Sequence, residues 1–328
     1  MRTFNFIATI AVLVGTTSLW VSESLAQNWF PSSPDSSFAR KTFDDQRFSV
    51  EFGAKAYDRP GDDLGLPLIS DSITNEALFD SENATDLGSA GGAEVKFNWI
   101  SAKRGRELEL RTIIADWEEF SQIDGANLTS PFFIDPAAQP SSIGYNYDSD
   151  YFSIELMARR AIRPGVTLMF GPRIVSTKDL VEISGSQVVL GTTFTEVQTT
   201  EATNVLLGLQ GGVEFNYPLA DGVRLNGFGR FGGYTNPTEV NFETTDALGA
   251  STESTLTKQT GSFLAEIGGR LYIDIFPNAL SAYVGYEATW IDGLALAPAQ
   301  IFSGGVNGVD TANTPFFNAA TLGLRWTY

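Results

Sequence analysis

The sequence contains neither cysteine nor histidine, and these two absences exclude most catalytic chemistries. Without cysteine the chain can form no disulfide and carries no cysteine for lipid attachment after export. Without histidine it cannot build a Ser-His-Asp or Cys-His site, or a histidine-ligated zinc or haem site. A pair of carboxylates could still act as acid and base, but no such pair can be identified from spacing. We therefore predict no enzyme activity, no cofactor and no bound metal.

Positive charge is also scarce. Among 328 residues, 21 are Lys or Arg and 39 are Asp or Glu, which gives a formal net charge of −18. Such a chain would repel phosphates, so we predict no nucleic-acid partner. Acidic connections at one end of the fold would repel anionic solutes and attract divalent cations.

The N-terminal apolar run, Phe4–Gly15, is too short to span a bilayer. It follows the basic start at Arg2 and precedes Ser24-Leu25-Ala26, a small-x-small cleavage pattern. These features predict a signal peptide over residues 1–26 and export of the mature chain. The Pro- and Ser-rich stretch that follows predicts a periplasmic linker over residues 27–45.

From Arg47 onward no long segment has the 3.6-residue period of an amphipathic helix, whereas a two-residue period recurs about ten times. In Ala320–Tyr328, for example, apolar residues alternate with Thr321, Gly323, Arg325 and Thr327. Each run has about the length that a tilted membrane strand needs. We therefore predict that residues 46–328 form an all-β fold, a transmembrane antiparallel up-and-down barrel of about ten strands, within a range of eight to twelve. The predicted strands are Phe48–Tyr57, Gly91–Trp99, Arg106–Trp117, Tyr151–Arg160, Val166–Thr177, Asn204–Tyr217, Val223–Thr235, Ser262–Ile275, Leu280–Ile291 and Phe316–Tyr328.

The connections alternate strictly between short and long, as in outer-membrane barrels with short periplasmic turns and long outer loops. An even number of strands would place both termini in the periplasm. The long loops could also extend the hairpins or contain another pair of strands, and a β-bulge is expected where Ile113-Ile114 interrupts the alternation. The short connections are Ser101–Gly105, Ile162–Gly165, Pro218–Gly222 and Phe276–Ala279, and the long ones are Asp58–Gly88, Glu119–Asp150, Lys178–Thr203, Asn236–Gly261 and Asp292–Pro315.

Aromatic residues fall near both ends of the predicted strands, as expected of girdles at the two membrane interfaces. The predicted girdle residues are Trp99, Tyr217, Trp326 and Tyr328 at the short-turn end, and Trp117, Tyr151, Tyr234 and Trp290 at the long-loop end.

If the apolar rows face lipid, the alternate residues face the lumen and include equal numbers of cations and anions. In a barrel of about ten strands such side chains would fill much of the bore, so they could form either a rigid polar core or the lining of a small pore. The predicted lumen cations are Lys55, Lys96, Arg111, Arg159, Arg173, Arg224, Arg230, Arg270 and Arg325. The predicted lumen anions are Glu51, Glu94, Glu107, Glu109, Glu155, Glu214, Glu266, Asp274 and Glu287.

The block GYEATWIDGLALAP differs from the surrounding strands and contains Gly285, Tyr286, Glu287, Trp290, Asp292, Gly293 and Pro298. Together with the rest of the second half, Thr203–Tyr328, it resembles β-barrel porins of the planctomycete outer membrane. The resemblance implies an outer-membrane location and a porin or surface-structural role, and no catalytic residue can be transferred from it. Glu287 is expected to pair with Arg270 or Arg325, and the apolar Leu294–Pro298 is expected to fold over the barrel mouth.

Two functions therefore compete. The resemblance favours a porin-like small channel of the outer membrane with a charge-lined lumen. The alternative is a closed structural or surface-interaction barrel with acidic outer loops and no conductance. The expected partners are outer-membrane lipid, the barrel-assembly machinery through the C-terminal strand, and small solutes or divalent cations.

Overall fold

The structure is a computed structural model, and it describes residues 48–60, 67–74, 76–80, 87–101, 106–125, 128–130, 140–189, 192–277, 279–303 and 308–328. The predicted signal peptide and linker lie outside these residues and stay predictions.

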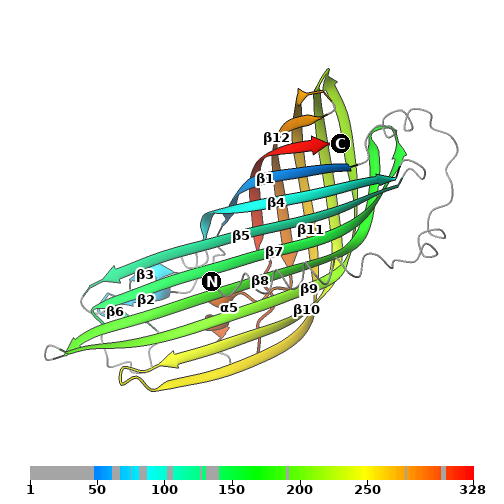
Figure 1. The fold of residues 1–328 in the computed structure, drawn as a ribbon. Coiled ribbons are helices and arrows are strands. Elements are labelled where there is room, and N and C mark those ends of the chain that lie inside the picture. The colour runs from blue at the N-terminus through cyan, green and yellow to red at the C-terminus, as the bar shows by residue number, and fades with distance from the viewer. Residues whose placement is uncertain are drawn as a thin grey trace. The chain divides into compact units, whose positions relative to one another are not determined.

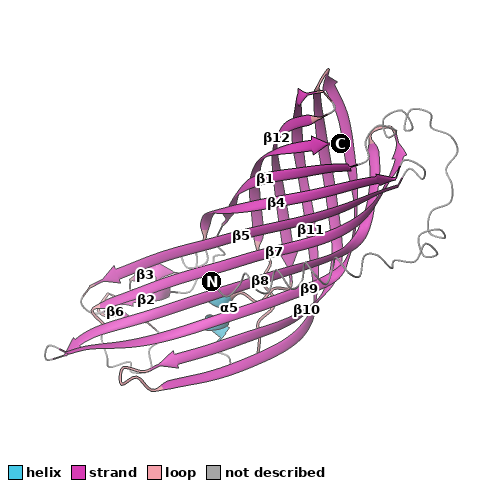
Figure 2. Cartoon of the chain, in the orientation of Figure 1, coloured by secondary structure: helices cyan, strands magenta, loops and turns pink. Residues whose placement is uncertain are grey.

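The predicted ten-stranded antiparallel up-and-down barrel is confirmed. Ten strands close in the order β1-β13-β12-β11-β10-β9-β8-β7-β5-β4, with each strand antiparallel to its neighbours (Figures 1 and 2). Closure leaves no free edge at the level where all ten strands pair. The strands are β1 (Phe48–Arg59), β4 (Gly88–Ser101), β5 (Arg106–Asp124), β7 (Ser142–Arg163), β8 (Val166–Val189), β9 (Thr192–Ala220), β10 (Val223–Thr245), β11 (Ser251–Phe276), β12 (Leu280–Asp292) and β13 (Phe316–Thr327).

The described parts of the long connections contain strands and a helix, where the sequence predicts loops. Strands β8 and β9 stay paired as far as Val189↔Thr192, and β10 and β11 as far as Thr245↔Ser251. Three short strands, β2 (Pro67–Asp71), β3 (Ala77–Asp80) and β6 (Leu128–Thr129), form a separate sheet within two other connections. A seven-residue helix, α5 (Ala297–Ser303), lies in the last one. The hairpins are therefore extended, which is one of the two possibilities that the sequence left open. The other, a further pair of strands, does not add to the barrel, because the three short strands form their own sheet.

The bulge expected at Ile113-Ile114 is wrong. Strand β5 pairs with β4 and β7 without a register shift, and Ile113 lies opposite Glu94 while Ile114 lies opposite Ala93. Ile113 is 3% exposed and points inward, whereas Ile114 is 47% exposed and points outward. The alternation therefore continues, and Ile113 is an apolar side chain of the interior.

Part-way along the longest strands, the apolar side chains change from the outer face to the inner face. In β8, Leu168 and Phe170 are exposed on the outer face while Arg173 is buried inside. Further along, the outer face carries the exposed Glu182 and the inner face carries the buried Val181. The first pattern suits an apolar surround and a polar interior, and the second suits water outside and an apolar core inside.

In one part of the barrel the outer face is apolar and the interior is polar. We call the exposed apolar side chains of this part the apolar belt. Its members are Phe52, Phe97, Leu108, Ile114, Leu168, Phe170, Leu207, Leu209, Phe215, Leu225, Phe231, Phe263, Ile267, Ile273, Val284, Leu322 and Leu324. We call the parts of β5 and β7–β11 beyond the belt the outer sheet, namely residues 117–124, 142–150, 176–189, 192–204, 235–245 and 251–262. These strands run well past β1 and β4 in Figure 1. The inner face of the outer sheet buries a continuous apolar core.

Just beyond the belt, the outer face of β5 and β7 carries like charges directly opposite each other. Asp116 lies across from Asp150, and Glu118 across from Asp148. Partial burial is the largest cause that raises the pKa of Asp148 above its usual range, and the negative charges of Glu118 and Asp116 raise it further. A carboxyl whose pKa is raised by folding stabilises the fold below its unfolded pKa and loses that contribution as the pH rises through the folded value.

We therefore expect Asp148→Asn to stabilise the fold at pH 7 by about 0.2–1 kcal/mol, the range for one cross-strand charge pair. The gain should shrink as the pH falls through the raised pKa of Asp148, because the wild-type carboxyl then takes up its proton. Unfolding midpoints in detergent at pH 7 and pH 4.5 measure the difference. Asp221→Asn, in the turn between β9 and β10, is the control, and an equal gain there would contradict the prediction.

Candidate functional site: the barrel lumen

The structure places fourteen of the eighteen predicted lumen residues in the buried interior. They are Lys55, Lys96, Arg111, Arg159, Arg173, Arg230, Arg270, Glu51, Glu94, Glu109, Glu155, Glu214, Glu266 and Glu287. The other four are partly exposed: the side chain of Glu107 is 12% exposed. Those of Arg224, Asp274 and Arg325, at the short-turn end, are 31%, 24% and 19% exposed.

Arg111 is at the centre of this group. From β5 its guanidinium donates to Glu94 at 2.9 and 2.8 Å, to Glu266 at 2.6 Å and to Glu287 at 2.8 Å. Glu94 is on the adjacent strand, whereas Glu266 on β11 and Glu287 on β12 lie across the lumen. One side chain therefore connects opposite walls of the barrel.

The remaining cations extend the same connectivity. Arg230 on β10 donates to Glu155 at 2.6 Å and to Glu109 at 3.1 Å, and Arg159 donates to Glu109 and to Glu214. Arg173 on β8 donates to Glu266 at 3.1 Å. Arg270 lies 2.6 Å from Glu94 and 3.2 Å from Glu51, and Lys55 contacts both Glu287 and Glu94. We call Lys55, Glu94, Glu109, Arg111, Glu155, Arg159, Arg173, Arg230, Glu266, Arg270 and Glu287 the ion-pair layer.

The ion-pair layer excludes solvent. The side chains of Glu94, Glu109 and Arg173 are 0% exposed, and those of Glu155 and Glu266 are 1% exposed. Removing so many charges from water is unfavourable unless each is compensated by opposite charges and hydrogen bonds. Here each of these carboxylates contacts two or more cations, so the layer is compensated internally.

Glu287 was expected to pair with Arg270 or Arg325. It lies 3.7 Å from Arg270, but its shorter contacts are to Arg111 and Lys55. Arg325 instead lies 3.7 Å from Glu51.

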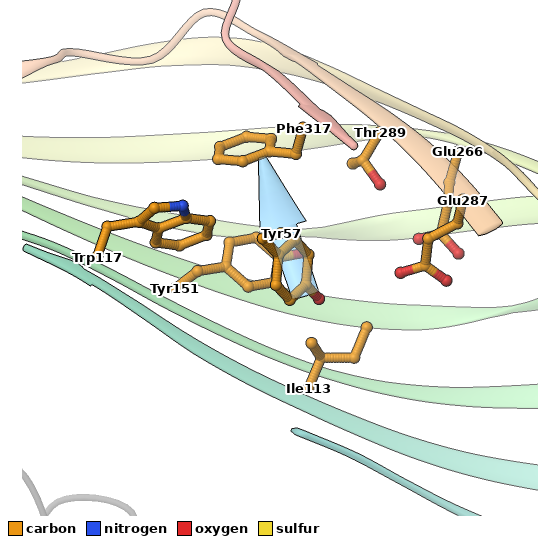
Figure 3. Close-up of a pocket in the computed structure, with 8 residues that line it drawn as sticks. All are labelled: Tyr57, Ile113, Trp117, Tyr151, Glu266, Glu287, Thr289 and Phe317. Atoms are coloured by element: carbon orange, nitrogen blue, oxygen red, sulfur yellow. The ribbon is translucent and has the colours of Figure 1, made fainter. Parts of the chain in front are cut away.

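An aromatic layer lies next to the ion-pair layer, toward the outer sheet. Tyr57 and Trp117 have ring centroids 5.4 Å apart, and Phe317 packs 5.8 Å from Trp117 and 5.9 Å from Tyr151. These rings border a cavity of about 10 Å³, room for about one water molecule. Figure 3 shows the rings on one side of this cavity and the two carboxylates on the other. Its lining residues are Tyr57, Ile113, Trp117, Tyr151, Glu266, Glu287, Thr289 and Phe317.

Three predicted girdle residues therefore do not face lipid. Trp117 is 2% exposed, and Tyr151 and Tyr234 are each 6% exposed, all inside the barrel. They were assigned by their nearness to strand ends, but their positions are in phase with the lumen residues Arg111, Glu155 and Arg230 on the same strands. The remaining five point outward, with Trp99 58%, Tyr217 65%, Trp290 40%, Trp326 50% and Tyr328 66% exposed.

A second buried ion pair was missed because both partners lie in segments that the sequence assigned to long loops. Arg59 and Asp179 are 3.3 Å apart. Ser149 donates to Asp179 at 2.6 Å, and Arg59 also donates to Ser149 and to the hydroxyl of Tyr147. Arg59 is in phase with Lys55 on β1, and Asp179 with Arg173 on β8, so longer strands would have revealed both.

The expected fold-over of the apolar segment after Asp292 is confirmed. Leu294 is 0% exposed and Leu296 is 3% exposed within the apolar core. The amide of Asn204 donates to the carbonyl of Ala295 at 2.7 Å and accepts from its N–H at 2.9 Å. We call Gly293–Ser303 the outer plug, because it covers the interior on the side of the outer sheet.

Residues of the block GYEATWIDGLALAP contribute to the lumen, the outer surface and the outer plug. Gly285 lies against Arg270, where a Cβ would approach Cγ of the arginine to 2.8 Å. Tyr286 points outward and donates to Asn318 at 2.6 Å, whereas Asp292 accepts from Thr314. Gly293 adopts φ 84°, and its carbonyl accepts from Asn236 and Ser262. Pro298 is buried in α5.

Among the described residues, no helix is long and apolar enough to cross a membrane. In the same part of the chain, no group of three or more acidic side chains is placed to hold a metal ion.

Comparisons with known proteins find barrels of low similarity. No family model matches the sequence, and no curated protein is similar to it in sequence. A major outer membrane protein from Thermus thermophilus is 12% identical, with a TM-score of 0.35, over 86% of this chain and 99% of that one. The translocator domain of the autotransporter NalP from Neisseria meningitidis is 10% identical, with a TM-score of 0.40, over 99% and 98%. The toluene transporter TodX from P. putida is 8% identical, with a TM-score of 0.39, over 86% and 90%.

Proposed function

We propose that the chain spans the outer membrane as a closed barrel and acts through the surface that it presents outside. The apolar belt, the charged interior and the predicted signal peptide support this location. The short-turn end and both termini would then lie in the periplasm, and the outer sheet would lie outside the cell. The resemblance of Thr203–Tyr328 to planctomycete barrels favours the same location.

One observation carries the closed state: the ion-pair layer joins opposite walls through side chains that water does not reach. Arg111 alone contacts carboxylates on β4, β11 and β12. The aromatic layer and the outer plug fill the interior beyond it. A porin-like channel, which the resemblance favours, would require these ion pairs to separate, and each separated charge would need new solvation. The geometry therefore supports the non-conducting alternative better.

The proposal assigns the partners by chemistry. Lipid acyl chains cover the apolar belt, and the aromatic end of β13 is the segment for the barrel-assembly machinery to recognise. The acidic outer face attracts divalent cations rather than anionic solutes. No catalytic step is part of the proposal.

Single-channel recording of the refolded protein in planar bilayers tests the closed state. We expect no conductance steps from the wild type. We expect Arg230→Glu and Arg270→Glu to lower the stability, because each puts an anion among carboxylates that the arginine otherwise compensates. Arg163→Glu, at the exposed end of β7, is the matched control and should change neither property. Steady conductance with an ion selectivity that shifts in folded Arg230→Glu would establish a pore instead.

A further inference from the structure

The part of β11 in the outer sheet has an open edge. Residues Ser251–Ser262 pair with β10, whereas β12 joins β11 only from Phe263↔Asp292 onward. From the described part of the chain, no backbone hydrogen bond reaches the other side of Ser251–Ser262. A row of unpaired N–H and C=O groups is a template on which another strand can pair.

This edge lacks the features that usually prevent pairing. It contains no proline, and its register with β10 is continuous from Ser251 to Ser262. Its inward-pointing cation, Lys258, is turned away from the free edge. The ammonium group donates to the carbonyl of Val309 at 2.9 Å and to the hydroxyl of Thr311 at 3.2 Å. Most of its residues are exposed, and the described segment near Val309 and Thr311 contacts the side chain of Lys258 without a backbone hydrogen bond to the edge.

The sequence of the edge is self-complementary in one register. We propose that two copies of the chain pair antiparallel along this edge, with Leu256 of one copy opposite Leu256 of the other. Leu256 is the only large apolar residue of Ser251–Ser262, and it is half-buried against the core of the outer sheet. A strand from a second copy would complete its burial.

The polar residues agree with the same register. Thr255 then lies opposite Thr257, and Glu253 opposite Gln259, so no like charges face each other. Opposite residues in such a two-fold pair share a face of the sheet, so alternative registers differ by two residues. Those alternatives place Leu256 opposite Ser254 or opposite Lys258, which leaves it against a polar side chain.

Because the chain has no cysteine, single-cysteine variants test the register directly. Opposite residues of an antiparallel pair have Cα atoms about 4.5–5.5 Å apart, within reach of a disulfide. In detergent, mild oxidation should convert most of full-length Leu256→Cys to a disulfide-linked dimer. Leu248→Cys, in the β10–β11 turn and 86% exposed, reports random collision and should remain monomeric. Equal cross-linking of the two variants would overturn the proposal.

A second measurement does not depend on cysteine chemistry. Leu256→Lys would place two ammonium groups face to face, so we expect dimerisation to weaken by about tenfold or more. Leu256→Val, which keeps an apolar side chain, should retain the dimer. Light scattering gives the mass, and far-ultraviolet circular dichroism shows that each variant keeps its strands. A monomeric wild type, or a dimer that persists unchanged in folded Leu256→Lys, would reject the pairing. This result does not depend on whether the lumen conducts ions.

Discussion

Replacing Arg111 with alanine should lower the free energy of unfolding by about 3–5 kcal/mol, the usual cost of removing one partner of a buried ion pair. The side chain of Arg111 is 1% exposed, and the four carboxylates within 3.6 Å of it, Glu94, Glu155, Glu266 and Glu287, are 0–5% exposed. Without the guanidinium these carboxylates stay close together in a region that water does not reach. Equilibrium unfolding in denaturant, with the protein in detergent, measures the loss.

Two variants show whether the loss comes from the ion-pair layer. Arg224→Ala removes a cation that is 31% exposed and 3.9 Å from Asp274, so it should cost at most about 1 kcal/mol. Adding Glu266→Gln to Arg111→Ala should recover part of the loss, because an amide does not carry the charge that Arg111 compensated. Equal effects of Arg111→Ala and Arg224→Ala would mean that the lumen is hydrated and that the layer does not close it.

The faces of the strands could be predicted from the sequence because a two-residue period depends only on local order. Lys55, Glu94 and Glu155 follow this period and lie inside. Partners across the lumen could not be predicted in this way. Arg111 and Glu266 are 155 residues apart and meet only because of the register of every strand between them. That register is a property of the closed sheet rather than of any one segment.

The ends of the strands were predicted less well for a related reason. The predicted strand Val166–Thr177 ends where the outer face becomes polar, but β8 continues to Val189 with its polar face outward. The hydrophobic pattern does not stop there; it moves to the inner face, where Val181 and Ile183 are buried. The outer apolar row alone therefore places Asp179 in a loop and gives no sign of its ion pair with Arg59.

The two tryptophans Trp117 and Trp99 should respond very differently to truncation. Trp117→Ala removes a ring that is 2% exposed and packs against Tyr57 and Phe317, so we expect a loss of about 3–5 kcal/mol. Trp99 is 58% exposed on the outer surface, so Trp99→Ala should cost much less. Unfolding in denaturant measures both, and the fluorescence of Trp117 should be less accessible than that of Trp99 to a water-soluble quencher.

A third variant separates packing from hydrogen bonding at Trp117. Its indole N–H has no hydrogen-bond partner among the described residues, so Trp117→Phe gives up ring volume but no bond to the protein. We therefore expect Trp117→Phe to retain most of the stability that Trp117→Ala loses, because a phenyl ring still contacts Tyr57 and Phe317. If Trp99→Ala were instead the more damaging change, Trp117 would be the lipid-facing residue and the aromatic layer would not fill the interior.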